Sequence, residues 1–86
     1  MYTILFKKSA VRELAKLPKS LIEKVRHYTA LLEKQPILTN SIKLIGFKNL
    51  YRIRIGDYRM IYLVEHSIKI ITITKIGHRK NVYKTN

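Results

Sequence analysis

Residues 50–62, LYRIRIGDYRMIY, decide the fold, because β-branched and aromatic residues alternate with basic ones on both sides of a Gly-Asp pair. Such alternation is typical of strands with one buried face, and Gly56-Asp57 is a two-residue hairpin signature. A turn of this length places Arg54 opposite Arg59. The stretch therefore predicts a β-hairpin with one apolar face and one basic face.

The register of this hairpin sorts its side chains onto two faces, since successive strand residues point to opposite sides of a sheet. We expect the core face to hold Tyr51, Ile53, Ile55, Tyr58, Met60, Tyr62 and Val64. Arg52, Arg54 and Arg59 share the other face. Like charges directly opposite each other destabilise a strand pair. Three convergent arginines without an adjacent acid therefore favour a phosphate site, which Arg binds through a bidentate fork, over the alternative of a solvated basic face.

Shorter elements flank the hairpin on both sides. A strand is predicted over residues 2–6, and a helix is predicted from an N-cap at Ser9 to Lys16. A second helix begins at a Ser20 capping box or at Pro18, and it ends at Pro36. A last strand covers residues 68–76, and Gly77 ends it. The order β-α-α-β-β-β predicts a single α+β domain over residues 1–86, with an antiparallel sheet and a two-helix hairpin packed on one face.

Charge is the strongest compositional signal in this chain. The 86 residues include 18 Lys and Arg but only 5 Asp and Glu, which gives a net charge of +13 and favours a polyanion or an acidic protein as partner. The absence of cysteine excludes disulfides and thiolate-bound metals and is consistent with a cytoplasmic protein. The longest apolar run, residues 60–64, is too short to cross a bilayer, so no membrane association is expected.

A second basic segment, GHRKNVYK, occupies residues 77–84. His78 is a candidate proton-transfer group, because histidine titrates near neutral pH, although an ordinary surface histidine is the alternative. Tyr83 can stack on a nucleic-acid base or pack over the edge of the sheet. This segment extends the basic character of the hairpin to the end of the chain.

Together, residues 50–62 and 77–83 resemble the RelE toxins of the RelE/ParE superfamily. The resemblance covers nearly the whole chain and includes Leu17-Pro18 and the segment 43–47. It implies the toxin of a type II toxin–antitoxin system, an endoribonuclease that cuts mRNA in the ribosomal A site and so inhibits translation. In this family the ribose 2′-hydroxyl attacks the adjacent phosphate, with no metal or other cofactor.

The resemblance also implies roles for individual residues. Arg52 and Arg54 stand where basic residues contact and activate the substrate, and Arg59 matches the arginine that stabilises the transition-state phosphate. Arg79 matches a residue that assists the leaving oxygen, and Tyr83 matches the aromatic residue that stacks on the cut nucleotide. Further RNA contacts are expected from Lys43, Lys48, Lys75, Lys80 and Lys84.

One departure from the family pattern concerns the general base. Well-known members carry lysines at the positions of Arg52 and Arg54, whereas arginine stays protonated in proteins and does not accept a proton. We therefore expect His78 to act as the general base. A metal-free route also agrees with the few acidic residues, which are spread over the helical and strand regions rather than clustered as a two-metal nuclease requires.

The expected partners are an acidic RelB-like antitoxin that covers the arginines, and the ribosome with its mRNA. We expect the free toxin to be monomeric and the toxin–antitoxin complex to be hetero-oligomeric. Two alternatives stay open. The first is a ParE-like DNA gyrase inhibitor without nuclease activity, although such relatives typically lack the basic segment after the last strand. The second is a weakened toxin that is retained as an antitoxin-binding partner.

Overall fold

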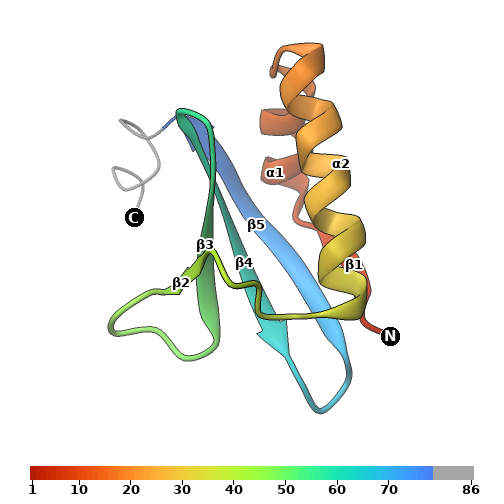
Figure 1. The fold of residues 1–86 in the computed structure, drawn as a ribbon, viewed down its shortest axis with the longest axis vertical. Coiled ribbons are helices and arrows are strands. Elements are labelled where there is room, and N and C mark those ends of the chain that lie inside the picture. The colour runs from red at the N-terminus through yellow and green to blue at the C-terminus, as the bar shows by residue number, and fades with distance from the viewer. Residues whose placement is uncertain (79–86) are drawn as a thin grey trace.

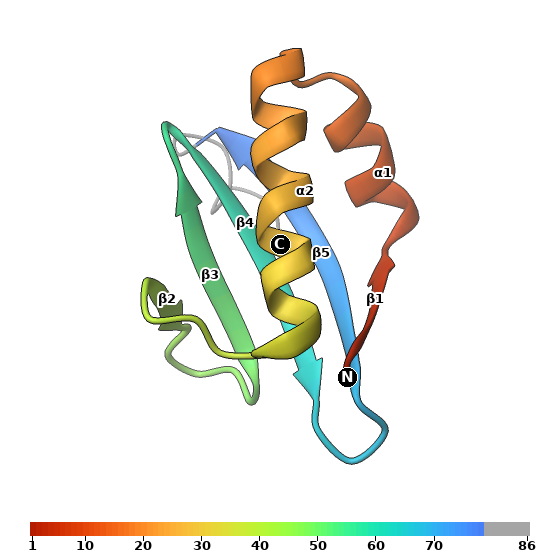
Figure 2. The ribbon, with the colours of Figure 1, turned by 45° about the vertical axis from the view of Figure 1, so that its right-hand side comes forward.

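The computed structural model describes residues 1–78, in which two helices cover one face of a five-stranded sheet (Figures 1 and 2). The helices are α1 (Lys8–Ala15) and α2 (Lys19–Lys34). The strands are β1 (Thr3–Phe6), β2 (Ser41–Lys43), β3 (Leu50–Ile55), β4 (Tyr58–Glu65) and β5 (Ile70–His78), and their order in the sheet is β1-β5-β4-β3-β2. The predicted α+β class and helical hairpin are confirmed. No helix in this part of the chain is long and apolar enough to span a membrane.

The sheet is mixed, which corrects the expectation that it is wholly antiparallel. β1 runs parallel to β5, with Thr3 opposite Ile70 and Phe6 opposite Ile73. The alternation of a four-residue strand reveals which side chains share a face, but it carries no information about the direction of the neighbouring strand. The additional strand β2 has only three residues, too few to show an alternating pattern.

The hairpin of β3 and β4 has the predicted register. Arg54 lies opposite Arg59, and the neighbouring pairs are Arg52 with Ile61, Ile53 with Met60, and Ile55 with Tyr58. Gly56 has a φ of 61°, a left-handed conformation that glycine adopts without strain and that a two-residue hairpin turn requires. The local turn therefore fixes which side chains of the two strands face the helices.

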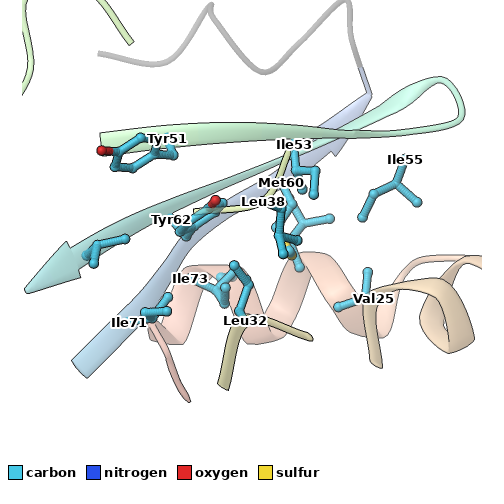
Figure 3. Close-up of a cluster of buried hydrophobic side chains, with 13 residues drawn as sticks. Val25, Leu32, Leu38, Tyr51, Ile53, Ile55, Met60, Tyr62, Ile71 and Ile73 are labelled. Atoms are coloured by element: carbon cyan, nitrogen blue, oxygen red, sulfur yellow. The ribbon is translucent and has the colours of Figure 1, made fainter. Parts of the chain in front are cut away.

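The core lies between this sheet face and the helices (Figure 3). Of the seven expected core residues, only Tyr58 is half-buried, at the turn end of β4, and the other six are buried. Helix α2 contributes Val25 and Leu32, and β5 contributes Ile71, Ile73 and Ile76. The rings of Tyr51 and Tyr62 stack with their centroids 5.8 Å apart.

Several predicted boundaries differ from the structure, among them the start of the last strand, which is Ile70 and not residue 68. Lys7 and Pro18 occupy the N-cap positions of α1 and α2 without side-chain caps, so Ser9 and Ser20 lie inside the helices. Strand β5 continues through Gly77 to His78, because Gly77 is still paired with Arg59 of β4. Glycine weakens a strand, but pairing with an existing neighbour overrides that preference.

Tyr62 makes the stability of the fold sensitive to alkaline pH. Its side chain is fully buried, and within residues 1–78 its hydroxyl makes no hydrogen bond of good geometry. Burial raises the pKa of Tyr62 above its ordinary value, while the nearby Ser41 and Leu38 act in the opposite direction. The phenol therefore ionises more readily in the unfolded chain than in the folded protein.

We expect the free energy of unfolding to fall as pH rises above about 10, where the unfolded phenol begins to ionise, and to keep falling until the raised folded pKa is reached. Tyr62→Phe removes this contribution, so urea denaturation at about pH 8 and about pH 11 measures it. Tyr28→Phe, at a half-buried position on α2, is the matched control and retains the loss. An equal alkaline loss in Tyr62→Phe and the wild type contradicts the assignment.

Candidate functional site

The arginines of the hairpin line a surface hollow of about 610 Å³ on the sheet face that points away from the helices. Its lining consists of Asn40, Ile42, Arg52, Arg54, Gly56, Asp57 and Arg59. The predicted convergence of the three arginines is confirmed. The expectation that no acid lies next to them is wrong, because the turn directs Asp57 into the same hollow.

The guanidinium groups of Arg54 and Arg59 reach the hollow in different ways. Arg54 is exposed, and its Nε donates a hydrogen bond to the Gly56 carbonyl at 3.2 Å. Arg59 is half-buried, and its Nη1 lies 3.4 Å from the Tyr58 carbonyl. The Nε of Arg59 is buried and has no hydrogen-bond partner among the described residues. Neither Arg54 nor Arg59 is ion-paired within residues 1–78, so both retain charge and donors for an anion.

Strand β2 completes the rim of the hollow. Ile42 lies opposite Arg52, and Asn40 precedes the strand. The sequence-based prediction missed both residues, because they belong to a segment with no strand signal beyond a single exposed isoleucine. Without β2, Arg52 would lie on an open edge strand; with it, Arg52 lies between two neighbouring strands.

Of the five predicted lysines, the three that the structure describes, Lys43, Lys48 and Lys75, do not line the arginine hollow. Lys43 ends β2 and Lys48 lies in the following loop, where both border a second hollow of about 480 Å³. The ammonium group of Lys75 lies 3.1 Å from the Glu13 carboxylate. The remaining predicted site residues, Arg79, Lys80, Tyr83 and Lys84, lie outside the described residues.

Glu13 supports the end of β5 that approaches the site. Strand β1 pairs with β5 only as far as Ile73, and beyond that point the Glu13 carboxylate accepts a 2.8 Å hydrogen bond from the Ile76 backbone N–H. The same carboxylate binds Lys75. A side chain of α1 thus replaces the missing strand neighbour, and it fixes the segment that places Gly77 opposite Arg59.

His78 lies on the other face of the sheet from the arginines. It is paired with Tyr58, and their ring centroids are 5.4 Å apart with the planes at 79°. Because Gly77 is opposite Arg59, the alternation of β5 places His78 on the face of Tyr58, toward the helices. The structure therefore does not bring His78 together with the arginines, and its expected role as general base stays a prediction.

The sheet face that carries the hollow also presents a row of mostly apolar side chains. Leu5, Thr72, Leu63 and Leu50 are successive cross-strand neighbours on β1, β5, β4 and β3. Leu5 is 47% exposed, and the other three are half-buried. Among the described residues, no helix covers this face (Figure 1). An uncovered sheet face with apolar and arginine-rich parts is suited to an amphipathic acidic partner.

Comparisons with known proteins agree with this architecture. A family model described as the ParE toxin of the type II toxin–antitoxin system parDE matches residues 4–83. RelE1 of Methanocaldococcus jannaschii is 34% identical over 80 residues, which cover 90% of this chain and 89% of that protein.

Solved structures extend the similarity to the fold. The RelE–RelB complex of Pyrococcus horikoshii OT3 contains a chain that is 36% identical with a TM-score of 0.83, over 91% of this chain and 94% of that one. The RelBE2 complex of Mycobacterium tuberculosis contains a chain that is 28% identical with a TM-score of 0.77, over 91% and 98% of the two chains. The similarity thus covers the helices, the sheet and the hairpin together.

Proposed function

The chain belongs to the ParE toxin family of type II toxin–antitoxin systems, within the RelE/ParE superfamily, and from this premise we propose that it is a RelE-type toxin that cleaves mRNA on the ribosome. The observation that carries the proposal is the convergence of three arginines on one hollow. Guanidinium groups bind phosphate oxygens in a fork and stabilise the charge that develops during phosphoryl transfer.

The proposed reaction is attack of a ribose 2′-hydroxyl on the adjacent phosphate. The attack forms a 2′,3′-cyclic phosphate and releases a 5′-hydroxyl. Arg52 and Arg54 hold the phosphate and the nearby backbone, and Arg59 stabilises the negative charge of the pentacoordinate phosphorus. Arg79 assists the departing oxygen and Tyr83 stacks on the cut nucleotide, as the family pattern implies. Binding the phosphate also relieves the repulsion between Arg54 and Arg59, which lie directly opposite each other.

Inhibition of DNA gyrase is the second candidate function, because the matching family model carries the name of the ParE toxins. We favour the ribonuclease for two reasons. The relatives with 34% and 36% identity carry the RelE name. The arginine hollow and the basic segment 77–84 also provide groups for RNA chemistry that binding to gyrase does not require.

We propose an acidic RelB-like antitoxin as the protein partner. The similar structures from Pyrococcus horikoshii and Mycobacterium tuberculosis are toxin–antitoxin complexes. A segment with acidic and apolar residues would cover the arginines and the row from Leu5 to Leu50 at once. Because the toxin carries a net charge of +13, association should slow and weaken as salt concentration rises.

Primer extension on a defined mRNA, with and without ribosomes, tests the proposed function. We expect new cuts at fixed positions within codons only when the toxin and translating ribosomes are both present. A DNA supercoiling assay with purified gyrase runs in parallel. An intact message combined with inhibited supercoiling would contradict the ribonuclease and support the ParE-like function, whereas inactivity in both assays would support the weakened toxin.

A further inference from the structure

We propose that Asp57 is the general base of this ribonuclease and accepts the proton of the attacking 2′-hydroxyl. The inference rests on the proposed function and concerns the same hollow. Among the described residues that line it, Asp57 has the only side chain that can take up a proton. The amide of Asn40 and the side chain of Ile42 are not bases, and arginine remains protonated.

The Asp57 carboxylate is not engaged elsewhere in the described structure. Within residues 1–78 it makes no ion pair and no hydrogen bond, even though it lines the same hollow as three arginines. Gly56 already supplies the positive φ that the turn needs, so the backbone geometry does not depend on residue 57. Asp57 therefore lines the hollow together with the phosphate-binding arginines, and no ion pair within residues 1–78 occupies its carboxylate.

The other acidic residues are excluded by their positions. Glu13 binds Lys75 and the end of β5, and Glu23 lies 3.9 Å from Arg26 on α2. Glu33 is also on α2, and Glu65 lies opposite Ile70, at the end of β4 far from the hairpin turn. None of these four residues lines the arginine hollow.

The histidines are also directed away from the hollow. His27 contacts the Tyr28 ring on α2, with centroids 5.6 Å apart. The Nδ1 of His66 lies 2.9 Å from the Tyr2 hydroxyl, beside the turn between β4 and β5. His78 is paired with Tyr58 on the face toward the helices. Asp57 can therefore accept the proton, a role that the permanently protonated Arg52 and Arg54 cannot perform.

The proposed step balances without a co-reactant. The 2′-oxygen forms a bond to phosphorus as its proton passes to a carboxylate oxygen of Asp57, and the bond between phosphorus and the 5′-oxygen breaks. The resulting carboxylic acid returns the proton through solvent to the departing 5′-oxygen, which restores the carboxylate. The arginines stay protonated throughout and stabilise the charged phosphorane.

Asp57→Asn tests the proposal, because asparagine suits a hairpin turn and removes only the base and its charge. With full-length toxin and ribosomes carrying a defined mRNA, we expect the single-turnover cleavage rate to fall about 100-fold. Toxin binding to the same ribosomes, measured separately, should be unchanged or tighter, because a negative charge has left the arginine hollow. If Asp57 were only a structural turn residue, its substitution would not slow cleavage while leaving ribosome binding intact.

Three further variants make the result decisive. Asp57→Glu should recover part of the rate, whereas Glu65→Gln, which removes an exposed carboxylate outside the hollow, should cleave like the wild type. Wild-type cleavage by Asp57→Asn, or a loss of cleavage in a His78→Gln variant of the rival base that Asp57→Asn does not show, would overturn the assignment and leave the ribonuclease proposal intact. Failure of the wild-type protein to cleave under the same conditions would overturn both proposals, so the two failures are distinguishable.

Discussion

Arg59→Ala is expected to slow mRNA cleavage on the ribosome by about 10² to 10³-fold, the usual loss when one preorganised donor to a developing oxyanion is removed. Arg59 is half-buried in the hollow, and its Nε has no hydrogen-bond partner within residues 1–78. Because Arg59 lines the hollow and makes no ion pair within residues 1–78, its guanidinium charge is available to a bound phosphate. Single-turnover cleavage of a defined mRNA measures the effect.

The stability of the same variant separates a catalytic loss from unfolding. Because Arg59 lies directly opposite Arg54, its removal relieves a repulsion, and we expect the free energy of unfolding to stay the same or to rise by up to about 1 kcal/mol. Arg12→Ala, at an exposed position on α1, removes the same charge away from the hollow and should leave cleavage unchanged. Equal cleavage losses in the two variants would point to overall charge rather than to the site.

Ile73→Ala is expected to lower the free energy of unfolding by about 2 to 5 kcal/mol, through lost burial and a cavity. Ile73 is fully buried in β5, where it lies opposite Phe6 of β1 and Tyr62 of β4. The substitution therefore removes contacts that join both neighbouring strands to the helices. Small domains have only about 5 to 15 kcal/mol of stability in total, so much of the protein would unfold under mild denaturant.

Urea denaturation monitored by circular dichroism measures this loss. Ile73→Val should cost only about 0.5 to 1.5 kcal/mol, because a single methylene is removed. Ile45→Ala, at a loop position that is 98% exposed, should change the free energy of unfolding by no more than about 0.5 kcal/mol. A loss at Ile45 as large as that at Ile73 would contradict the position of the core.

The hairpin could be predicted from the sequence because its information is local. Gly56-Asp57 sets a two-residue turn, and the turn sets the register of Arg54 opposite Arg59. Alternation along the two strands then separates the core side chains from the arginines. The convergence of Arg52, Arg54 and Arg59 follows from these two short-range effects.

The features that could not be predicted depend on contacts between distant segments. The parallel pairing of β1 with β5 depends on the path of the helical hairpin, and β2 is too short to show a pattern. The position of His78 opposite Tyr58 depends on the continuation of β5 through Gly77, where the sequence predicted that the strand ends. Asn40 and Ile42 reach the hollow through the pairing of β2 with β3, a contact between segments that are distant in sequence.

The most direct test of the ribonuclease uses two matched mRNAs on programmed ribosomes, one all-ribose and one with a single 2′-deoxynucleotide on the 5′ side of the cut. We expect the toxin to cleave the first message, leaving a 2′,3′-cyclic phosphate, and to leave the second intact at that position. Cleavage of both messages at the same rate, or of neither, would contradict attack by the 2′-hydroxyl in the arginine hollow.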